Sequence, residues 1–463
     1  MRVLLIVYDN DSFIHAFPLG IGYIASVLMK EGVEVIIYNQ DIHHYPEDHL
    51  TQYLDKQSFD VVGIGVIGGY YQYQKLKKIS DAINRSDNRP KYYILGGHGP
   101  SPEPEFFLKK MQADVVVMGE GEETIVALFR AISKNQSLHT INGIAFQKDN
   151  HVTINPERPL IEDIDAIPWP AYHLFPMTYY RLIRYPHCKN NDFVMQILSA
   201  RGCTFKCNFC YRMDKGYRVR NPEAIMEEIR FLQKDYQINY IDFTDELLMS
   251  SRKRVIEICE AIQKSKLTFK WFCNGRLNYA KPDILKLMKT TGCVYINYGI
   301  EAFDDDALKV MNKALTTQQI ESGINATLDS GISPGFNFIF GNIGEDTDIL
   351  DKDVDFLLKY DDQSELRTIR PVTPYPGSPL YYYAIEKGLL KDVEEFYETK
   401  HVNSDLLSVN FTAMSDETFH DRLMHANIRL IKNYYQKISD RMVELSHKLY
   451  KNLDANFRGY RQT

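Results

Sequence analysis

The sequence predicts an α/β protein in which two alternating regions are followed by a helical C-terminal region. Short apolar runs alternate with helix-like patterns in the first third of the chain and again over residues 193–380. From about residue 381 onward the chain is polar and helix-like. Continuous apolar runs are typical of strands buried on both faces, and helices between them imply parallel pairing. We therefore expect a doubly wound sheet followed by an open barrel.

The composition is that of an ordinary globular protein. The 463 residues allow two to four domains at roughly 100–200 residues each. Hydrophobic residues make up 44% and charged residues 25%, which excludes a disordered tail protein, a fibre or a small disulfide scaffold. The formal net charge of -7 argues against general binding of nucleic acid, although a local basic patch is compatible with it.

The first region contains five strand–helix units. Its strand candidates are Val3–Tyr8, Val33–Tyr38, Val61–Val66, Tyr92–Leu95 and Val115–Met118, and its helix candidates are 19–30, 47–56, 71–84, 103–111 and 122–133. These units predict a flavodoxin-like (Rossmann-type) domain over residues 1–140, with its ligand beyond the carboxyl ends of the strands. Residues 141–192 are predicted to form a hairpin and then a proline-rich linker.

The second region, residues 193–380, alternates in the same way. Its strand candidates are 194–198, 239–243, 270–273, 294–298, 335–340 and 367–372. Six units are too few for a closed eight-fold barrel, so we predict a partial (β/α)6 TIM-like barrel with site residues at the carboxyl ends of its strands. Residues 381–463 complete the chain. Their tyrosines either line a substrate pocket or, as we favour, pack between helices: Tyr381, Tyr382, Tyr383 and Tyr397.

No segment is expected to cross a membrane. The longest nearly apolar stretch, Phe17 to Met29, is too short for a bilayer. The apolar run at the N-terminus ends at Asp9, and no small-residue cleavage site follows it, so no secretion signal is predicted. We therefore expect the protein to be cytoplasmic.

The cysteines single out one loop. There are seven, none before Cys188, and an odd number in an intracellular chain favours metal binding or catalysis over disulfides. Cys203, Cys207 and Cys210 follow the first barrel strand. Three thiolates can bind three irons of a [4Fe–4S] cluster and leave the fourth iron open to chelate an amine and a carboxylate. A structural zinc site is the alternative, although zinc sites more often show paired C-x-x-C spacings.

The spacing C-x-x-x-C-x-x-C with Tyr211 behind it, after the first strand of a six-unit barrel, resembles the radical S-adenosylmethionine (SAM) superfamily. The preceding sheet domain narrows the resemblance to the cobalamin-binding branch, over roughly residues 1–385. The resemblance implies a [4Fe–4S] cluster on the three cysteines, SAM and cobalamin as cofactors. It also implies a small-molecule substrate and an electron donor such as flavodoxin or ferredoxin, with no nucleic-acid partner.

Polar and glycine residues at consecutive strand ends resemble the SAM contacts of that branch. The residues so implied are Tyr211, Asp245, Glu246, Arg276, Glu301 and Gly341. Acidic side chains would hold the amine or the ribose hydroxyls of SAM, and Arg276 would hold its carboxylate. Gly341 and Tyr211 would lie near the adenine. Each charge alone also fits an ordinary surface position at a strand end, but their recurrence favours binding.

Glycine-rich loops at the strand ends of the first region resemble those that line the corrin and its nucleotide tail in the same branch. The residues are Pro18, Leu19, Gly20, Gly68, Gly69, Gly96, Gly97, His98, Gly119 and Gly121. Glycine lets a bulky planar ligand approach the backbone. The alternative is that these glycines only permit tight turns between strand and helix.

A histidine ligand for cobalt is not predicted. Asp41-Ile42-His43 resembles the Asp-x-His motif of cobalamin proteins that ligate cobalt through histidine, but Pro46 stands where those proteins carry glycine. The motif also follows the second strand candidate rather than the first. We therefore interpret His43 as a surface histidine, with His15 as an alternative near the cobalt.

The resemblance implies reductive cleavage of SAM to a 5′-deoxyadenosyl radical and methylation of an unactivated carbon, with the cofactors carrying the hard chemistry. Individual catalytic residues are not identified. One alternative is an oxidative cyclase or rearrangement enzyme without methyl transfer, similar to the anaerobic magnesium-protoporphyrin ester cyclase. Another is a cofactor sensor.

A methylthiotransferase is disfavoured because residues 1–187 contain no cysteine. Cys273, at a strand end, fits a buried small hydrophobe better than a hydrogen-atom donor.

Overall fold

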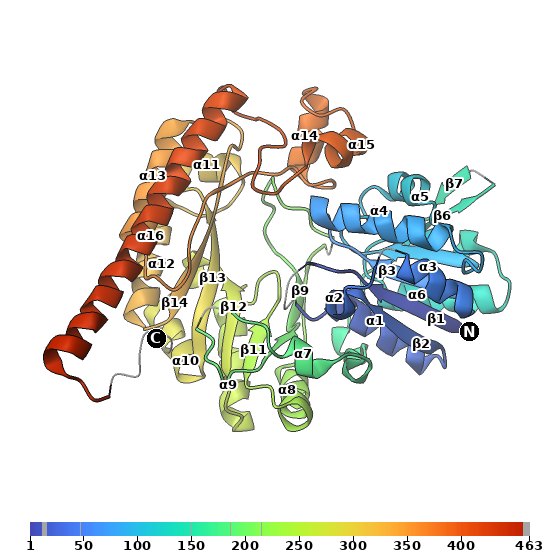
Figure 1. Cartoon of the computed structure of the whole chain (residues 1–463), viewed down its shortest axis with the longest axis horizontal. Helices are drawn as coiled ribbons and strands as arrows, with labels where there is room; N and C mark the ends of the chain where they lie inside the picture. Colours follow the sequence, from blue (N-terminus) through green and yellow to red (C-terminus); the bar gives the residue numbers. More distant parts are fainter. Residues whose placement is uncertain (12–15, 47, 150, 186, 214, 457–463) are drawn as a thin grey trace.

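The computed structural model describes residues 1–11, 16–46, 48–149, 151–185, 187–213 and 215–456. Figure 1 shows two α/β bodies side by side, with the long helix α16 (Asp416–Asn452) along the outer flank of the second. Both predicted alternating regions are confirmed.

The N-terminal sheet has the order β2-β1-β3-β4-β5-β6-β7, and its first five strands are parallel. These strands are β1 (Arg2–Val7), β2 (Glu34–Asn39), β3 (Val61–Gly65), β4 (Tyr92–Gly96) and β5 (Val115–Val117). The order β2-β1-β3-β4-β5 is the flavodoxin-like one. Each strand lies within a residue or two of its predicted position.

Helices cover both faces of this sheet. They are α1 (Leu19–Lys30), α2 (Gln40–His43), α3 (His49–Lys56), α4 (Tyr70–Asn84), α5 (Pro104–Met111) and α6 (Glu122–Ser133). Alternate strand residues point to opposite faces. Leu5 and Val61 therefore pack with α1 and α6, while Leu4 and Val62 pack with α3, α4 and α5.

The predicted hairpin is confirmed and lies at the edge of the same sheet. Strands β6 (Ile144–Lys148) and β7 (His151–Ile154) pair antiparallel, and β6 pairs antiparallel with β5. The following linker contains the short turns η2 (Ile164–Ala166), η3 (Tyr172–Leu174) and α7 (Met177–Tyr180).

The second sheet is a curled, all-parallel half-barrel with the order β15-β14-β13-β12-β11-β8. Its strands are β8 (Val194–Ile197), β11 (Tyr240–Phe243), β12 (Lys270–Gly275), β13 (Cys293–Glu301), β14 (Ser333–Phe340) and β15 (Arg370–Pro371). Its helices are α8 (Pro222–Tyr236), α9 (Arg252–Ser265), α10 (Pro282–Thr290), α11 (Asp305–Val310), α12 (Thr317–Asp329) and α13 (Thr347–Lys359). Six strands leave the barrel open, as predicted. β15 is shorter than the predicted 367–372, and the Arg367 side chain lies in an ion-pair network ahead of the strand.

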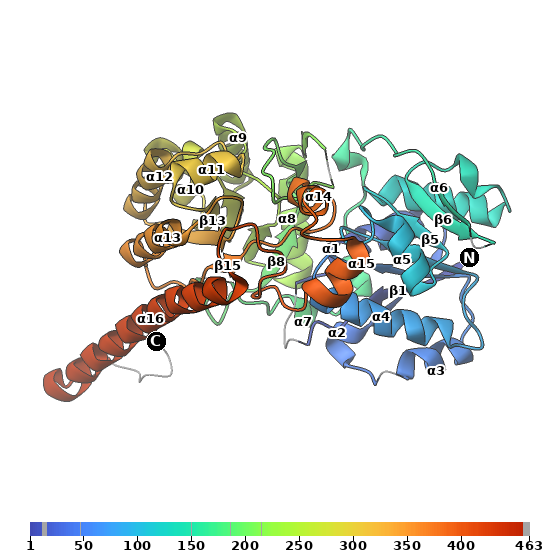
Figure 2. The ribbon, with the colours of Figure 1, turned by 90° about the horizontal axis from the view of Figure 1, so that it is seen from above.

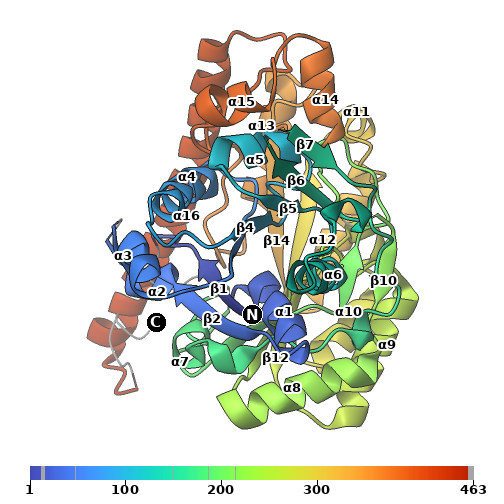
Figure 3. The same cartoon turned by 90° about the vertical axis from the view of Figure 1, so that its right-hand side faces the viewer.

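The C-terminal region first returns to the N-terminal sheet. It forms α14 (Pro379–Glu386), α15 (Val393–Glu395) and a π-helical turn, η5 (Phe396–Lys400), beside α4 and α5 (Figures 2 and 3). Glu398 accepts hydrogen bonds from Tyr73 (2.6 Å) and Lys77 (3.0 Å), and Lys110 lies 3.0 Å from the same carboxylate. Residues 379–400 therefore tie the two α/β bodies together.

The favoured interpretation of helix packing is confirmed for Tyr381 and Tyr397 but not for Tyr382. Tyr381 and Tyr397 are buried in the core shared with α4 and α5, and Tyr382 is exposed. Among the helices that the structure describes, none combines the length and the apolar character needed to cross a membrane.

Candidate active site

The cysteine loop is carried by a small hairpin that the sequence analysis missed. Strand β9 (Ala200–Gly202) pairs antiparallel with β10 (Tyr217–Val219), and the three cysteines lie in the loop between them. Gly202 has φ +83°, a conformation that favours glycine, so the chain turns sharply just before Cys203. The hairpin presents the thiols above the carboxyl end of β8.

Hydrogen bonds fix this loop to the end of α11 and to the end of β14. The Asn208 backbone N–H donates to the Met311 carbonyl (2.9 Å), and the side chains of Asn208 and Asn342 bond each other. Asn312 Nδ2 donates to the Lys206 carbonyl (2.7 Å). The loop is therefore preorganised by the barrel before any cofactor binds.

Arg276, at the end of β12, lies against the same loop. Its guanidinium is 3.4 Å from the centre of the Phe205 ring and donates to the backbone carbonyls of Lys313 and Ala314. It also interacts electrostatically with Cys203 and Cys207. This arrangement stabilises negative charge on the thiolates, a role that the sequence analysis did not anticipate.

The three thiols fit the ligands of an iron cluster. Burial raises the pKa of Cys203, and nearby Glu246 and Cys207 raise it further. Desolvation, with Glu246 and the other two thiols, raises the pKa of Cys210 to about 12. A bound metal cation would favour the thiolate forms of Cys203 and Cys210, whose pKa is raised in this way.

The thiols do not converge on one point. Within the described residues, no three His, Cys, Asp or Glu side chains are grouped closely enough to hold a single metal ion. Thiolates that bind a [4Fe–4S] cluster each bind a different iron and surround the cluster.

A cavity of about 680 Å³ lies between the N-terminal sheet and the barrel. From the barrel side it is lined by Gln196, Leu198, Ala200, Arg201, Gly202, Met213, Thr244 and Glu246. On the other side it reaches between the sheet and helices α1 and α6, where the lining is apolar. The cavity therefore connects the N-terminal domain with the surroundings of the cysteine loop.

Most residues predicted for cobalamin line this cavity. They are Pro18, Leu19, Gly20, Gly96, Gly97, His98, Gly119 and Gly121. A Cβ added at Gly20 or Gly119 would meet nothing within 4 Å, so both glycines face open space. The open space beside these glycines is bounded by backbone and fits a bulky planar ligand with a long tail. Gly97 has a structural role as well, because φ is +94° and an added Cβ would lie 2.5 Å from the Val66 carbonyl oxygen.

Gly68 and Gly69 are not among the residues that line the cavity. A Cβ at Gly68 would lie 3.3 Å from the Tyr397 hydroxyl, and one at Gly69 would clash with Gln72. The structure thus places the Gly68 loop against residues 375–397 and the start of α4 rather than at the cavity.

Of the residues predicted for SAM, only Glu246 is among the residues that line the cavity. The Asp245 carboxylate is fully buried and accepts hydrogen bonds from the backbone N–H groups of Ser199 (2.6 Å) and Ala200 (2.9 Å). Asp245 therefore shapes the turn between β8 and β9. Glu301 is buried and pairs with Lys313 Nζ at 2.8 Å.

Tyr211 and Gly341 make protein contacts. Tyr211 packs against Gly377, where an added Cβ would lie 2.5 Å from its ring, and its ring centre is 6.3 Å from that of His98. Gly341 has φ +97°, and an added Cβ would lie 2.6 Å from the Phe419 ring of α16. Gly341 therefore allows α16 to pack on the barrel, a role that sequence alone did not reveal.

The histidine interpretation is confirmed for His43, which is exposed and stacks on Tyr45 with ring centres 4.9 Å apart. His15 lies outside the described residues.

A buried ion-pair network joins the cysteine hairpin to the N-terminal domain. Arg201 and Arg218 are cross-strand neighbours in the hairpin, and two like charges in that position repel each other. Glu120 lies between them, with its oxygens 2.8 Å from both guanidinium groups, and Glu122 also pairs with Arg201. Although burial raises it, hydrogen bonds from Arg218 and Arg201 hold the pKa of Glu120 below its usual range. The network fixes the cavity wall next to Cys203.

A ladder of asparagines lines the inner face of three barrel strands. Asn297 Nδ2 donates to Asn274 Oδ1, and Asn337 Nδ2 donates to Asn297 Oδ1, both at 3.1 Å. Asn337 is exposed despite its place in β14. The neighbouring Cys273 points to the opposite face and is fully buried in the hydrophobic core, which confirms its interpretation as a small hydrophobe.

Comparisons with known protein families agree with this arrangement. Residues 9–129 match the model of the B12 binding domain, and residues 197–357 match that of the radical SAM superfamily. Fold and family models thus define a two-domain enzyme that combines a B12 binding domain with a radical SAM domain. The chain belongs to the cobalamin-binding branch of the radical SAM superfamily, and the expected cofactors, a [4Fe–4S] cluster, SAM and cobalamin, are those of its two domains.

Relatives are found over most of the chain. An uncharacterized methyltransferase of Pyrococcus horikoshii is 29% identical over 88% of this chain and 90% of that protein. The anaerobic magnesium-protoporphyrin IX monomethyl ester cyclase of Rubrivivax gelatinosus is 27% identical over 82% and 68%, respectively.

Two solved structures have the same fold. The radical SAM methyltransferase TsrM from Kitasatospora setae, with cobalamin and a [4Fe–4S] cluster bound, has a TM-score of 0.66 and 18% identity over 83% of this chain and 75% of that chain. OxsB with aqua-cobalamin bound has a TM-score of 0.65 and 20% identity over 83% of this chain and 55% of that chain.

Proposed function

We propose that the protein methylates an unactivated carbon of a small molecule, using SAM, the [4Fe–4S] cluster and cobalamin. The observation that carries the proposal is the cavity, which has cobalamin-type glycine loops on one wall and the cysteine hairpin on the other. The similarity to a methyltransferase over 88% of the chain supports methyl transfer as the outcome.

When bound, the cluster supplies the electron that cleaves SAM, and cobalamin carries the methyl group. The protein's own residues position these groups. Cys203, Cys207 and Cys210 would hold the cluster, while Arg276 and Asn208 keep their loop in place. The apolar cavity wall excludes water from the reacting groups.

We infer that the substrate carries neutral hydrogen-bonding groups. The asparagine ladder offers amide donors and acceptors at the inner face of the barrel, and Gln196 of β8 adds an amide that lines the cavity. Asp242 bonds Gln196 at 3.2 Å, and burial raises the pKa of Asp242 to about 7, so its carboxyl group is partly protonated near neutral pH. Amides and a neutral carboxyl group match an uncharged polar substrate better than a strongly charged one.

The test is anaerobic reconstitution with iron, sulfide and hydroxocobalamin, followed by incubation with SAM and a reductant. We expect the protein to bind iron, sulfide and corrin, and to form 5′-deoxyadenosine and S-adenosylhomocysteine. Formation of neither nucleoside by material loaded with both cofactors contradicts the proposal.

Cyclisation or rearrangement without methyl transfer is the second candidate, favoured by the similarity to the Rubrivivax cyclase over 82% of the chain. The mass of the product distinguishes the two, because methylation adds one CH2 unit. A cyclase would also form no S-adenosylhomocysteine in proportion to product.

We further propose that a flavodoxin or ferredoxin supplies the electrons and that the protein acts in the cytoplasm. All seven cysteines are free, which is consistent with a reducing compartment. Replacement of a chemical reductant by a flavodoxin, its reductase and NADPH should sustain SAM cleavage if this assignment holds.

A further inference from the structure

Helix α16 carries an apolar stripe that the barrel does not cover. Apolar residues recur at alternating intervals of four and three over four heptads. They are Met424, Ile428, Ile431, Tyr435, Ile438, Met442, Leu445 and Leu449, which we call the α16 stripe. This is the a/d pattern of a coiled coil, with Ile428, Tyr435, Met442 and Leu449 at a positions.

The stripe is separate from the face that packs on the barrel. That face consists of Phe419, Leu423, Ala426 and Leu430, all of which are buried. Met424 is 50% exposed and Tyr435 is 58% exposed. Figure 2 shows the C-terminal half of α16 projecting beyond the rest of the molecule. Large apolar side chains in a row on an exposed helix mark an interaction site.

Contacts with the barrel come from the first part of the helix. Arg429 pairs with Asp351 and Asp355 of α13, and Lys437 pairs with Asp361. A second helix that packs along the stripe would therefore contact a different face of α16 from the face that contacts the barrel.

The stripe is complementary to itself in one antiparallel register. If Tyr435 packs against Ile438 of a second copy, Ile431 meets Met442, Ile428 meets Leu445 and Met424 meets Leu449. Every layer then combines an a position with a d position, as antiparallel coiled coils require. The seam is about 39 Å long at 1.5 Å per residue.

The flanking charges also allow this register. The basic side chains beside the stripe are His425, Lys432, Arg441 and Lys448, and no acidic residue occupies those e and g positions. In the antiparallel pair, Lys432 lies opposite Ser439, Arg441 opposite Tyr434, and Lys448 opposite Asn427. Each cation therefore faces a neutral side chain, and Arg441 can lie over the Tyr434 ring. No like charges meet across the seam.

We propose that two copies of the protein pair antiparallel through the α16 stripe. The two-fold axis passes between residues 436 and 437, so the projecting half of each helix covers the first half of its partner. Pairing buries the exposed side chains of Met424, Ile428, Ile431 and Tyr435. The proposal is independent of the cofactors and of the reaction.

The first experiment measures the mass of the full-length protein by anaerobic size-exclusion chromatography with light scattering. We expect twice the chain mass of 53.8 kDa at about 50 µM. The double variant Ile431→Lys/Ile438→Lys should be monomeric, because it places four lysines in the seam. The matched control is Gln436→Lys/Val443→Lys, which adds the same charges to the same helix away from the stripe and should remain dimeric. Circular dichroism of both variants should match the wild type.

The second experiment tests the orientation. Protein carrying Met424→Cys is mixed with protein carrying Leu449→Cys and treated anaerobically with a short bismaleimide, with wild-type protein as the control for native cysteines. An antiparallel pair gives mixed crosslinks between the two variants, whereas a parallel pair gives crosslinks within each variant alone.

Three outcomes would overturn the proposal. They are a monomeric wild type at 50 µM, a dimer that survives Ile431→Lys/Ile438→Lys, and crosslinks restricted to like variants. A monomer whose stripe binds phosphatidylglycerol vesicles would assign the surface to a membrane instead.

Discussion

At the carboxyl end of the barrel strands, Arg201 and Arg218 share Glu120 of the other domain, whereas at the amino end Arg367 lies among acidic residues of its own loop. Both sites bury guanidinium groups: the Arg201 side chain is 11% exposed and that of Arg367 is 5% exposed. At both sites a carboxylate oxygen lies within 3.5 Å of a guanidinium nitrogen. Their surroundings, however, differ.

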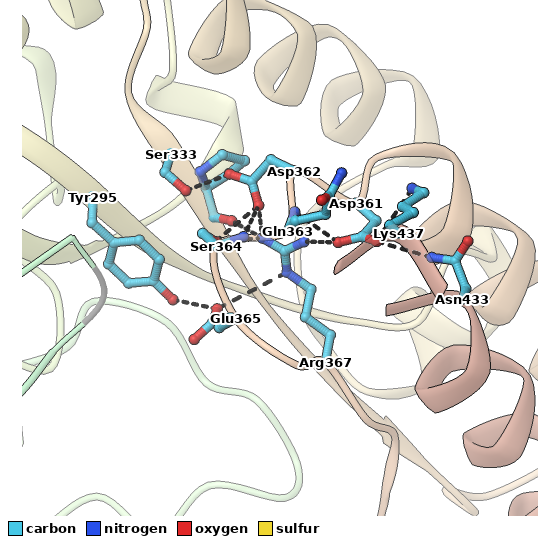
Figure 4. Close-up of polar contacts among 11 residues, drawn as sticks. Tyr295, Ser333, Asp361, Asp362, Gln363, Ser364, Glu365, Arg367, Asn433 and Lys437 are labelled. Atoms are coloured by element: carbon cyan, nitrogen blue, oxygen red, sulfur yellow. Dashed lines mark hydrogen bonds and ion pairs between the residues drawn. The ribbon is translucent and has the colours of Figure 1, made fainter. Parts of the chain in front are cut away.

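The amino-end network stays within the barrel and the helix α16 that packs on it (Figure 4). Arg367 binds Asp362 at 2.7 Å and Asp361 at 3.3 Å, and it donates to the Pro334 carbonyl at 2.8 Å. Asp361 also accepts from Asn433 and Lys437 of α16. The network joins one loop, the start of β14 and α16, and therefore stabilises the end of the barrel.

The carboxyl-end network joins segments that are far apart in the sequence and lies at the cavity. Arg201 belongs to the barrel hairpin and Glu120 to the N-terminal domain, 81 residues earlier, whereas no N-terminal-domain residue is among the partners given above for Arg367 and Asp361. Arg201, Glu120 and Glu122 all line the cavity. Burial of charge alone thus does not identify a functional site; its position at the carboxyl ends of the strands and beside a cavity does.

The largest effect is expected when the carboxyl-end site loses a cluster ligand. Cys207→Ser should abolish iron binding at the loop and reduce SAM cleavage to background, because a serine hydroxyl replaces a thiolate. Iron and sulfide analysis and 5′-deoxyadenosine formation measure this. Cys188→Ser, which changes a half-buried cysteine outside the loop, should retain both. Retention of a full cluster by Cys207→Ser would contradict the assignment.

Glu120→Ala should destabilise the protein and uncouple the two domains. It leaves two buried guanidinium groups without their shared partner, which costs about 3–5 kcal/mol. We expect a lower unfolding midpoint in urea, loss of bound corrin and slower SAM cleavage. Glu123→Ala, an exposed neighbour on α6, is the control and should change none of these. Equal behaviour of the two variants would show that the network does not join the domains.

Arg367→Met should lower stability without affecting the site. Removal of this buried partner of Asp361 and Asp362 costs about 3 kcal/mol, but iron content and SAM cleavage per cluster should remain unchanged. Arg370→Met, which removes an exposed ion pair with Asp405, should cost less than about 1 kcal/mol. A loss of activity per cluster in Arg367→Met would contradict the distinction between the two ends.

His401 shows what a buried titratable group without a charged partner does. It is fully buried, its ring stacks on Phe396, and neither ring nitrogen has a hydrogen-bond partner within the described residues. Burial lowers the pKa of His401 from 6.5 to about 4. The unfolded chain therefore binds a proton at higher pH than the folded protein, and stability falls as the pH drops from 6.5 toward 4, by about 3 kcal/mol.

His401→Phe should remove this part of the pH dependence, because phenylalanine keeps the stacking and cannot be protonated. Urea unfolding of both proteins at pH 7 and pH 5 measures the difference. An unchanged pH dependence in His401→Phe would show that other groups cause it.

Much of the fold could be predicted because apolar runs and helix patterns are local properties of the chain. β1 to β5 and α1 follow from continuous apolar runs and amphipathic periodicity. The hairpin β9–β10 could not be predicted in this way, because each strand has three residues and its pairing depends on charges from the other domain. For the part of α16 that projects, the sequence pattern predicts only a polar helical region.

The site could be predicted where the chemistry lies within one loop, as with Cys203, Cys207 and Cys210. It could not be predicted where distant residues meet. Asp245 looks like a free carboxylate at a strand end, but its Oδ1 accepts from the backbone N–H groups of Ser199 and Ala200, and its Oδ2 accepts from the Ser199 hydroxyl. Arg201 precedes the cysteine loop, and Glu120 lies in a glycine loop. The position of these two opposite charges beside two site motifs is the sequence feature that could have indicated their ion pair.

The return of residues 379–400 to the N-terminal sheet has a consequence for how the molecule is made. Tyr381, Phe396 and Tyr397 complete a core whose other half, around Tyr73 and Phe107, is synthesised some 300 residues earlier. During synthesis, the apolar surface around Tyr73 and Phe107 is exposed until residues 379–400 have left the ribosome. An N-terminal domain expressed alone would expose the same apolar surface, because the residues that cover it come from positions 379–400.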